Sequence, residues 1–114
     1  MVKLDIKEEV FIRDKGRCVV TGAGTLERTP HHCFFKSEYF EDDRDEAWNL
    51  VCIGMRPHRY IHMAKDEIEA RIGEAYDQDL KELALSRYKG KHKEKLTKAF
   101  KVKHGYTKRK TKKD

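Results

Sequence analysis

The sequence predicts a small α+β domain, and three observations support this fold class. Its 114 residues are enough for one domain with a modest core. Short β-branched and aromatic runs in the first half give way to longer stretches of helical period in the second half. Because 40% of the residues are charged and 38% are hydrophobic, few apolar side chains remain for packing, and the core should be thin.

The N-terminal part should form a helix, a strand and a loop. Asp5 and Glu8 have the spacing of a capping box, so a short helix is expected over residues 6–14. The segment "RCVVTG" (17–22) is typical of a strand that runs into a turn, and "AGTLERTP" (23–30) of a loop.

Two further strands should flank an acidic segment. Both "HHCFF" (31–35) and "NLVCI" (49–53) have the aromatic and β-branched content of strands. Between them, "EYFEDDRDEAW" (38–48) has many acids and no clean period, which favours a solvated loop.

The second half of the chain should be helical. Pro57 suits the first turn of a helix, and a pattern of helical period continues over residues 58–72. Gly73 is expected to interrupt this helix. A second helix is predicted over residues 79–89 and a basic one over residues 91–102.

The net charge of +6 is unevenly distributed. Residues 87–114 contain 13 Lys or Arg against two carboxylates, a net +11, which leaves −5 on residues 1–86. A basic segment with interleaved aromatic residues is typical of a nucleic-acid binder, although a tail that only increases solubility is an alternative. We therefore predict a core over residues 1–73 and a helical, strongly basic extension over residues 74–114, disordered from residue 104.

The cysteines and the N-terminus indicate an intracellular protein. Three cysteines at irregular spacing argue against a secreted disulfide framework, so reduced thiols are expected. No apolar run approaches the length of about 18 residues that spans a bilayer, and acids occupy the position of a signal peptide's apolar region. We expect a cytoplasmic location, in the host cytoplasm if a phage encodes the chain, and no membrane partner.

Four histidines and an asparagine should converge on one place. His31 and His32 begin one predicted strand and Asn49 begins another, whereas His58 and His62 lie four residues apart on one helical face. Two imidazoles on adjacent helical turns can share a metal ion while a strand supplies a third ligand. Because a strand alternates its faces, adjacent histidines cannot have the same task, and the second strand histidine is left for proton transfer.

These residues resemble a known family. The motifs "HH", "WN" and "HRYIH", with "FIRDKGRCVVTG" before them and "NLVCIG" after the Asn, resemble the His-Asn-His (HNH) nucleases of the ββα-metal fold. That family includes colicin DNase domains and many small phage-encoded nucleases. The resemblance covers roughly residues 8–64, and the nine-residue interval from Asn49 to His58 is similar to the colicin type.

The resemblance implies a role for each residue. His31, His58 and His62 would hold one divalent metal ion (Mg, Mn, Ni or Zn), His32 would be the general base, and Asn49 would hold the loop and orient that base. It further implies hydrolysis of DNA phosphodiester bonds, by nicking or double-strand cleavage, to 5′-phosphate and 3′-hydroxyl ends. We expect weak sequence preference, since no separate sequence-reading domain is visible.

The chain departs from the family at the zinc knuckle that many members have. Those members have two C-x-x-C pairs. Here Thr21 occupies the position of the partner of Cys18, and after Cys52 the position before the helix histidine is Pro57. Two of four thiolates are therefore missing. No structural zinc is expected, and Cys18 and Cys52 should be small buried hydrophobic residues.

Basic residues near the helix start and in the extension are the predicted DNA contacts. Arg56 and Arg59 would bind a phosphate, or alternatively pair with the acidic loop. In the extension, the predicted contacts are Lys91, Lys93, Lys95, Lys98, Lys101, Lys103, Lys108, Arg109 and Lys110.

Other functions remain open beside the endonuclease. The chain could be a non-catalytic DNA-binding protein that keeps the metal fold for stability. It could also be the nuclease subunit of a larger restriction, recombination or packaging assembly, and a homodimer is a further alternative. A zinc protease is excluded, because the H-E-x-x-H motif needs Glu after its first histidine and residue 59 is Arg.

Overall fold

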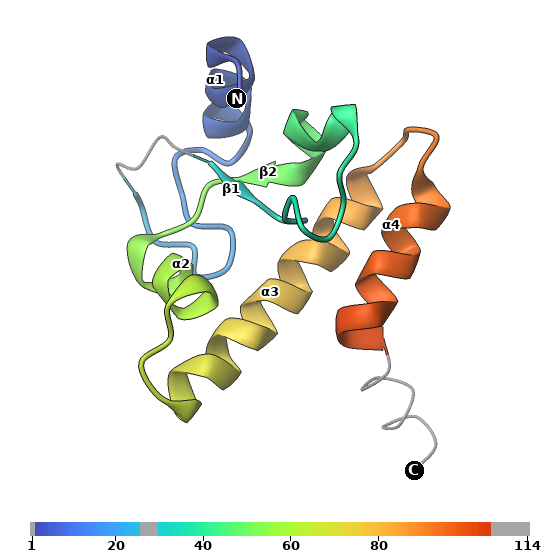
Figure 1. The fold of residues 1–114 in the computed structure, drawn as a ribbon. Helices are drawn as coiled ribbons and strands as arrows, with labels where there is room; N and C mark the ends of the chain where they lie inside the picture. Colours follow the sequence, from blue (N-terminus) through green and yellow to red (C-terminus); the bar gives the residue numbers. More distant parts are fainter. Residues whose placement is uncertain (1, 26–29, 106–114) are drawn as a thin grey trace.

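One long helix organises the fold. The computed structural model describes residues 2–25 and 30–105, which form four α-helices and a two-stranded antiparallel sheet (Figure 1). Helix α3 (Glu67–Arg87) crosses the molecule, with the sheet and α2 (Met55–His62) on one side and α4 (Lys93–Phe100) on the other (Figure 1). The predicted α+β class is confirmed.

The sheet is shorter than predicted. Strands β1 (His31–His32) and β2 (Leu50–Val51) pair antiparallel, with His31 opposite Val51 and His32 opposite Leu50. The predicted strands over 31–35 and 49–53 are wrong beyond these residues. The chain turns instead, because the backbone N–H groups of residues 38 and 39 both donate to the Phe35 carbonyl.

Residues 2–25, the described N-terminal part, have one helix and no strand. Helix α1 (Leu4–Arg13) begins after Lys3, whose side chain makes no capping bond, so the predicted capping box is wrong. The predicted strand over 17–22 is also wrong. The Cys18 carbonyl accepts from the Gly22 N–H at 2.7 Å and the Cys18 N–H donates to Ala23, which closes a tight turn with only an isolated bridge.

Helices α2 and α3 replace the single helix predicted over 58–72. The break lies at residues 63–66, where the Asp66 side chain caps α3 by accepting from the Glu69 N–H at 2.9 Å. Gly73 lies inside α3 and does not interrupt it. Its role is to let α2 lie close, because a Cβ there would be 2.1 Å from the Tyr60 carbonyl oxygen. The predicted domain boundary at residue 73 therefore falls inside one continuous helix that ends at Arg87.

The C-terminal extension packs on the rest of the fold. Leu96 and Phe100 of α4 are buried, and a π-helical turn (Lys101–Gly105) follows. His104 in this turn is also buried, so disorder from residue 104 is the wrong prediction for that residue. Residues 106–114 lie outside the described part of the chain.

The acidic segment 38–48 is folded, not a solvated loop. It contains two 3-10 turns, η1 (Asp42–Asp45) and η2 (Ala47–Asn49). The Asp43 carboxylate accepts from the hydroxyls of Tyr39 at 2.6 Å and Tyr88 at 2.7 Å, and its carbonyl accepts from Trp48. Because these three aromatic side chains are buried, the segment joins α3 to the core.

None of the helices in the described residues combines the length and apolar character that crossing a bilayer would require.

Candidate metal centre

Three imidazoles from β1 and α2 meet in the structure, as the sequence predicted. His31 lies on β1, and His58 and His62 lie one turn apart on α2. One ring nitrogen from each lies within 4.8 Å of the others, and the ring centroids are 4.7 to 5.3 Å apart. This spacing fits a shared metal ion, since Zn–N distances are about 2.0–2.1 Å.

His31 has the properties of a metal ligand. It is buried, and its Nε2 has no hydrogen-bond partner among the described residues. Burial, together with the nearby charges of His58 and His62, lowers the pKa of His31 to about 3. The ring is therefore neutral at pH 7, which is the form that binds a metal. A buried polar atom without a partner is costly, and a metal ion would satisfy it.

The histidines line an open cavity of about 270 Å³. His58 and His62 are exposed, so the cavity is reachable from solvent. Two cations that the sequence analysis did not select, Lys36 and Arg44, line it as well. The Arg44 Nε is buried without a described hydrogen-bond partner. The cavity therefore combines imidazoles with positive charge, a combination that suits an anionic ligand.

His32 contacts a carboxylate on the other side of the strand. Its Nε2 lies 2.7 Å from Oδ1 of Asp45 in η1, with both side chains nearly three-quarters buried. Because a carboxylate only accepts, the His32 Nε2 carries the proton, and Nδ1 of a neutral ring can accept one. This hydrogen bond is the main cause that lowers the pKa of Asp45. Asp45 was missed because it is one of six acids between residues 38 and 48.

Asn49 stabilises the loop but does not bond His32 in the described contacts. Its amide is fully buried, donates to the carbonyls of Phe34 at 3.1 Å and Arg44 at 2.9 Å, and accepts from the Phe34 N–H at 2.8 Å. Because Arg44 precedes Asp45, the bond from Asn49 to the Arg44 carbonyl holds the backbone next to Asp45. Any effect of Asn49 on His32 therefore passes through Asp45.

The two arginines predicted to bind phosphate lie away from the imidazoles. Arg59 is paired with Glu69 of α3, at 2.9 and 3.3 Å, rather than with the acidic segment 38–48. Arg56 is exposed, two residues before His58 and so on roughly the opposite face of α2. Neither lines the cavity of the three imidazoles.

Half of the described lysines predicted to bind DNA have intramolecular partners. Lys93 donates to the Leu85 carbonyl, Lys95 pairs with Glu41, and Lys103 lies 3.3 Å from Asp77. The exposed remainder is Lys91, Lys98 and Lys101. Lys108, Arg109 and Lys110 lie outside the described residues.

A buried charge cluster lies behind the imidazoles. Lys81 is fully buried and pairs with Asp77 at 2.6 Å and Glu38 at 3.2 Å. Its Nζ lies 4.2 Å from the centre of the Phe35 ring, which in turn packs against His31 and His62. His104 donates from Nε2 to the Asp77 carboxylate at 2.9 Å, so the C-terminal extension contributes to this buried cluster.

All three cysteines are buried free thiols, as expected for small apolar residues. Burial raises the pKa of Cys33 to about 12, which makes that thiol unreactive at neutral pH.

The chain matches none of the protein-family models, curated proteins or solved structures with which it was compared, so the function proposed below depends on the geometry of the site.

Proposed function

We propose that the chain is a metal-dependent endonuclease that hydrolyses DNA phosphodiester bonds, with β1, β2 and α2 forming a ββα-metal site. The observation behind this proposal is the meeting of three imidazole nitrogens within 4.8 Å, in a cavity that is also lined by His32. A DNA-binding protein that uses a metal only for stability would be expected to close its coordination shell with four protein ligands. The three ligands found among residues 2–25 and 30–105 leave a position open, which is typical of catalytic sites.

His31, His58 and His62 would hold the ion. Imidazole ligands suit Zn²⁺ and Ni²⁺ better than Mg²⁺, which prefers oxygen, so the former are the favoured metals. When bound, the ion would supply positive charge to stabilise the phosphate and the departing oxygen.

His32 would act as the general base. With its Nε2–H donated to Asp45, the ring offers Nδ1 to accept a proton from the attacking water. The Asp45 carboxylate then stabilises the imidazolium that forms. General-base assistance of this kind is worth roughly a hundred- to ten-thousandfold in rate.

Lys36 and Arg44 would bind the substrate phosphate. Both line the same cavity as the imidazoles, and ionic hydrogen bonds to phosphate oxygens are about twice as strong as neutral ones. These two residues replace Arg56 and Arg59 as the phosphate contacts nearest to the metal ligands.

The test is cleavage of supercoiled plasmid by the full chain, first in EDTA and then with single metals added back. Wild-type protein should nick or linearise the plasmid only with metal. His32→Ala should lose cleavage but keep the rise in melting temperature that metal causes, because an ion that binds only the folded state stabilises it. His58→Ala should lose both.

Three results would count against the proposal. Cleavage by both variants would exclude these histidines from the reaction. Loss of the metal-induced rise in His32→Ala would mean that His32 is a ligand. Metal-induced stabilisation of wild type without any cleavage would favour the non-catalytic DNA-binding protein.

A further inference from the structure

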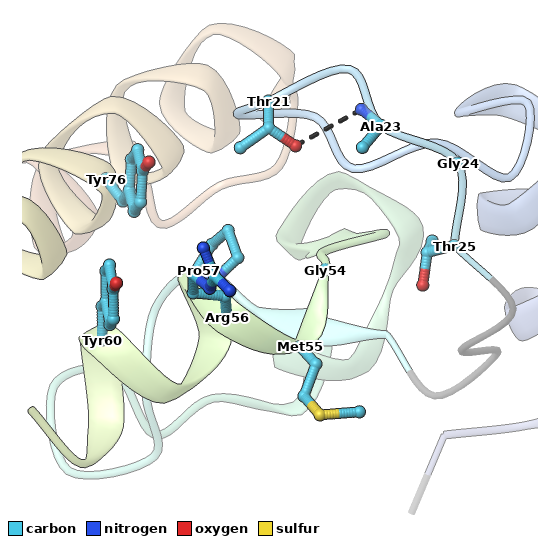
Figure 2. A pocket seen from close by; sticks show the side chains of 10 residues that line it. All are labelled: Thr21, Ala23, Gly24, Thr25, Gly54, Met55, Arg56, Pro57, Tyr60 and Tyr76. Atoms are coloured by element: carbon cyan, nitrogen blue, oxygen red, sulfur yellow. Dashed lines mark hydrogen bonds between the residues drawn. The ribbon is translucent and has the colours of Figure 1, made fainter.

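A larger cavity of about 760 Å³ lies on the other side of α2 from the imidazoles. Figure 2 shows its walls: Tyr60 of α2 and Tyr76 of α3 stand on one side, and the turn that contains Thr21 and Thr25 forms the other. The first turn of α2, with Arg56, lies between them (Figure 2). A volume of this size is typical of cavities that bind small organic ligands.

The lining has the chemistry of a site for an aromatic, anionic group. Arg56 is the one charged residue among the described residues that line the cavity, and none of these residues is a carboxylate. Two tyrosine rings supply apolar surface, and the Arg59 guanidinium lies 5.0 Å from the centre of the Tyr60 ring. Arg59 is neutralised by Glu69, but no described acid lies within ion-pair distance of Arg56. Arg56 is therefore available for an external anion.

We propose that this cavity binds an unstacked nucleotide of a DNA strand, with its base against Tyr60 and Tyr76 and its phosphate at Arg56. The inference rests on the proposed nuclease function and names the form of DNA that the chain prefers. Aromatic side chains stack on any base, whereas an arginine neutralises the phosphate, and this pairing is typical of single-strand binding sites. Arg56 and the two tyrosine rings match the phosphate and the base of a nucleotide, whereas an uncharged apolar peptide offers no group to pair with Arg56.

The two cavities can serve one strand. Tyr60 and His58 are two residues apart on α2 and therefore point in directions that differ by roughly 200°. The helix between the cavities is roughly 10–12 Å wide including side chains. A strand that passes over the first turn of α2 can place one phosphate at the imidazoles and a neighbouring nucleotide in the larger cavity. DNA with unpaired nucleotides at the cleavage point should thus be the preferred substrate.

The test measures binding of a fluorescein-labelled single-stranded oligonucleotide to the full chain, in EDTA so that no cleavage occurs. Base stacking is worth about 1–3 kcal/mol, so Tyr76→Ala should weaken binding by roughly 5- to 150-fold. Tyr76→Phe keeps the ring and should bind like wild type. Arg56→Ala should weaken binding and make its salt dependence shallower by about 0.7, the slope for one single-strand phosphate.

An oligonucleotide with abasic positions supplies the decisive control. It keeps the phosphates but lacks the bases, so wild type and Tyr76→Ala should bind it equally. A Tyr76→Ala protein that binds the intact oligonucleotide like wild type would overturn the proposal. So would an equal loss for both oligonucleotides, because the effect would then not involve a base.

The outcome is separable from that of the proposed function. Binding is measured in EDTA and cleavage only with added metal, so each result is obtained without the other. If wild type failed to cleave plasmid while Tyr76→Ala still weakened binding, the nucleotide site would stand and the nuclease would not. Cleavage with no effect of Tyr76→Ala would show the reverse.

Discussion

Replacing Asp77 by Asn should destabilise the protein strongly, because it leaves Lys81 buried without its closest partner. The Lys81 side chain is fully buried, with the Asp77 carboxylate 2.6 Å away and Glu38 farther off at 3.2 Å. Removing one partner of a buried ion pair costs about 3–5 kcal/mol. Since Glu38 remains, we expect about 3 kcal/mol, which is a large part of the roughly 5–15 kcal/mol that stabilises a domain.

Thermal and urea denaturation followed by circular dichroism measure this cost. For a domain of this size, 3 kcal/mol corresponds to a fall in melting temperature of about 12–24 °C. Asp79→Asn is the matched control, since it makes the same chemical change at an exposed position of the same helix. In the double variant Asp77→Asn with Lys81→Met, no lysine charge stays buried, and most of the loss should be recovered.

A cost below about 1 kcal/mol for Asp77→Asn, equal to that of Asp79→Asn, would refute this reasoning. It would mean that Glu38 and solvent satisfy Lys81, and that the cluster behind the imidazoles does not depend on Asp77.

Three further predictions address other parts of the molecule. Asp45→Ala should lower kcat for DNA cleavage by up to about a hundredfold, which is the low end of the range for general-base assistance. KM and the metal-induced rise in melting temperature should not change. Asp42→Ala in the same turn is the control, and an equal effect of the two substitutions would exclude a positioning role for Asp45. Deleting residues 106–114 removes five Lys or Arg and no described core residue, so affinity for duplex DNA should fall. The slope of log affinity against log salt concentration should become shallower by up to about 4 to 5. An unchanged slope would exclude this segment from DNA binding. Burial raises the pKa of Asp77, but Lys81 and the hydrogen bonds outweigh it and the pKa is lowered, so the stability that this carboxylate contributes should be complete above about pH 4 and disappear as pH falls further. The difference in melting temperature between wild type and Asp77→Asn should therefore shrink in acid, and a constant difference from pH 2 to 7 would contradict the assignment.

The meeting of the three imidazoles was predictable in part from local rules. A four-residue interval places His58 and His62 on one helical face, and strand alternation separates His31 from His32. Both relations hold within single elements, whereas the approach of α2 to β1 was expected from the order of strands and helix and from the resemblance of the motifs to the HNH nucleases. Whether these residues hold a metal and cleave DNA remains a prediction.

The contacts of Asp45 and His104 with distant segments were not predictable from patterns. Asp45 is selected from its acidic neighbours only by the turn that places it beside His32, and nothing in its local sequence marks it. His104 lies among basic residues that suggest a solvated tail, yet Asp77, 27 positions earlier, draws it into a buried pair. The strands were predicted too long for a related reason. After two residues the backbone forms turn hydrogen bonds in place of sheet hydrogen bonds, and the periodicity of the sequence does not indicate where this change occurs.

The two-residue strand β1 makes the chain sensitive to changes in length rather than to changes in composition. Strand alternation turns His31 and His32 to opposite sides, and the register of their pairing with Val51 and Leu50 sets which histidine faces which side, so a shift by one residue exchanges the two faces. Asn49 bonds to Phe34 at one end of the intervening segment and to Arg44 within it, so a single inserted or deleted residue there cannot be absorbed locally. Related sequences should therefore vary freely in many of their surface residues, while the lengths around this strand pair stay constant.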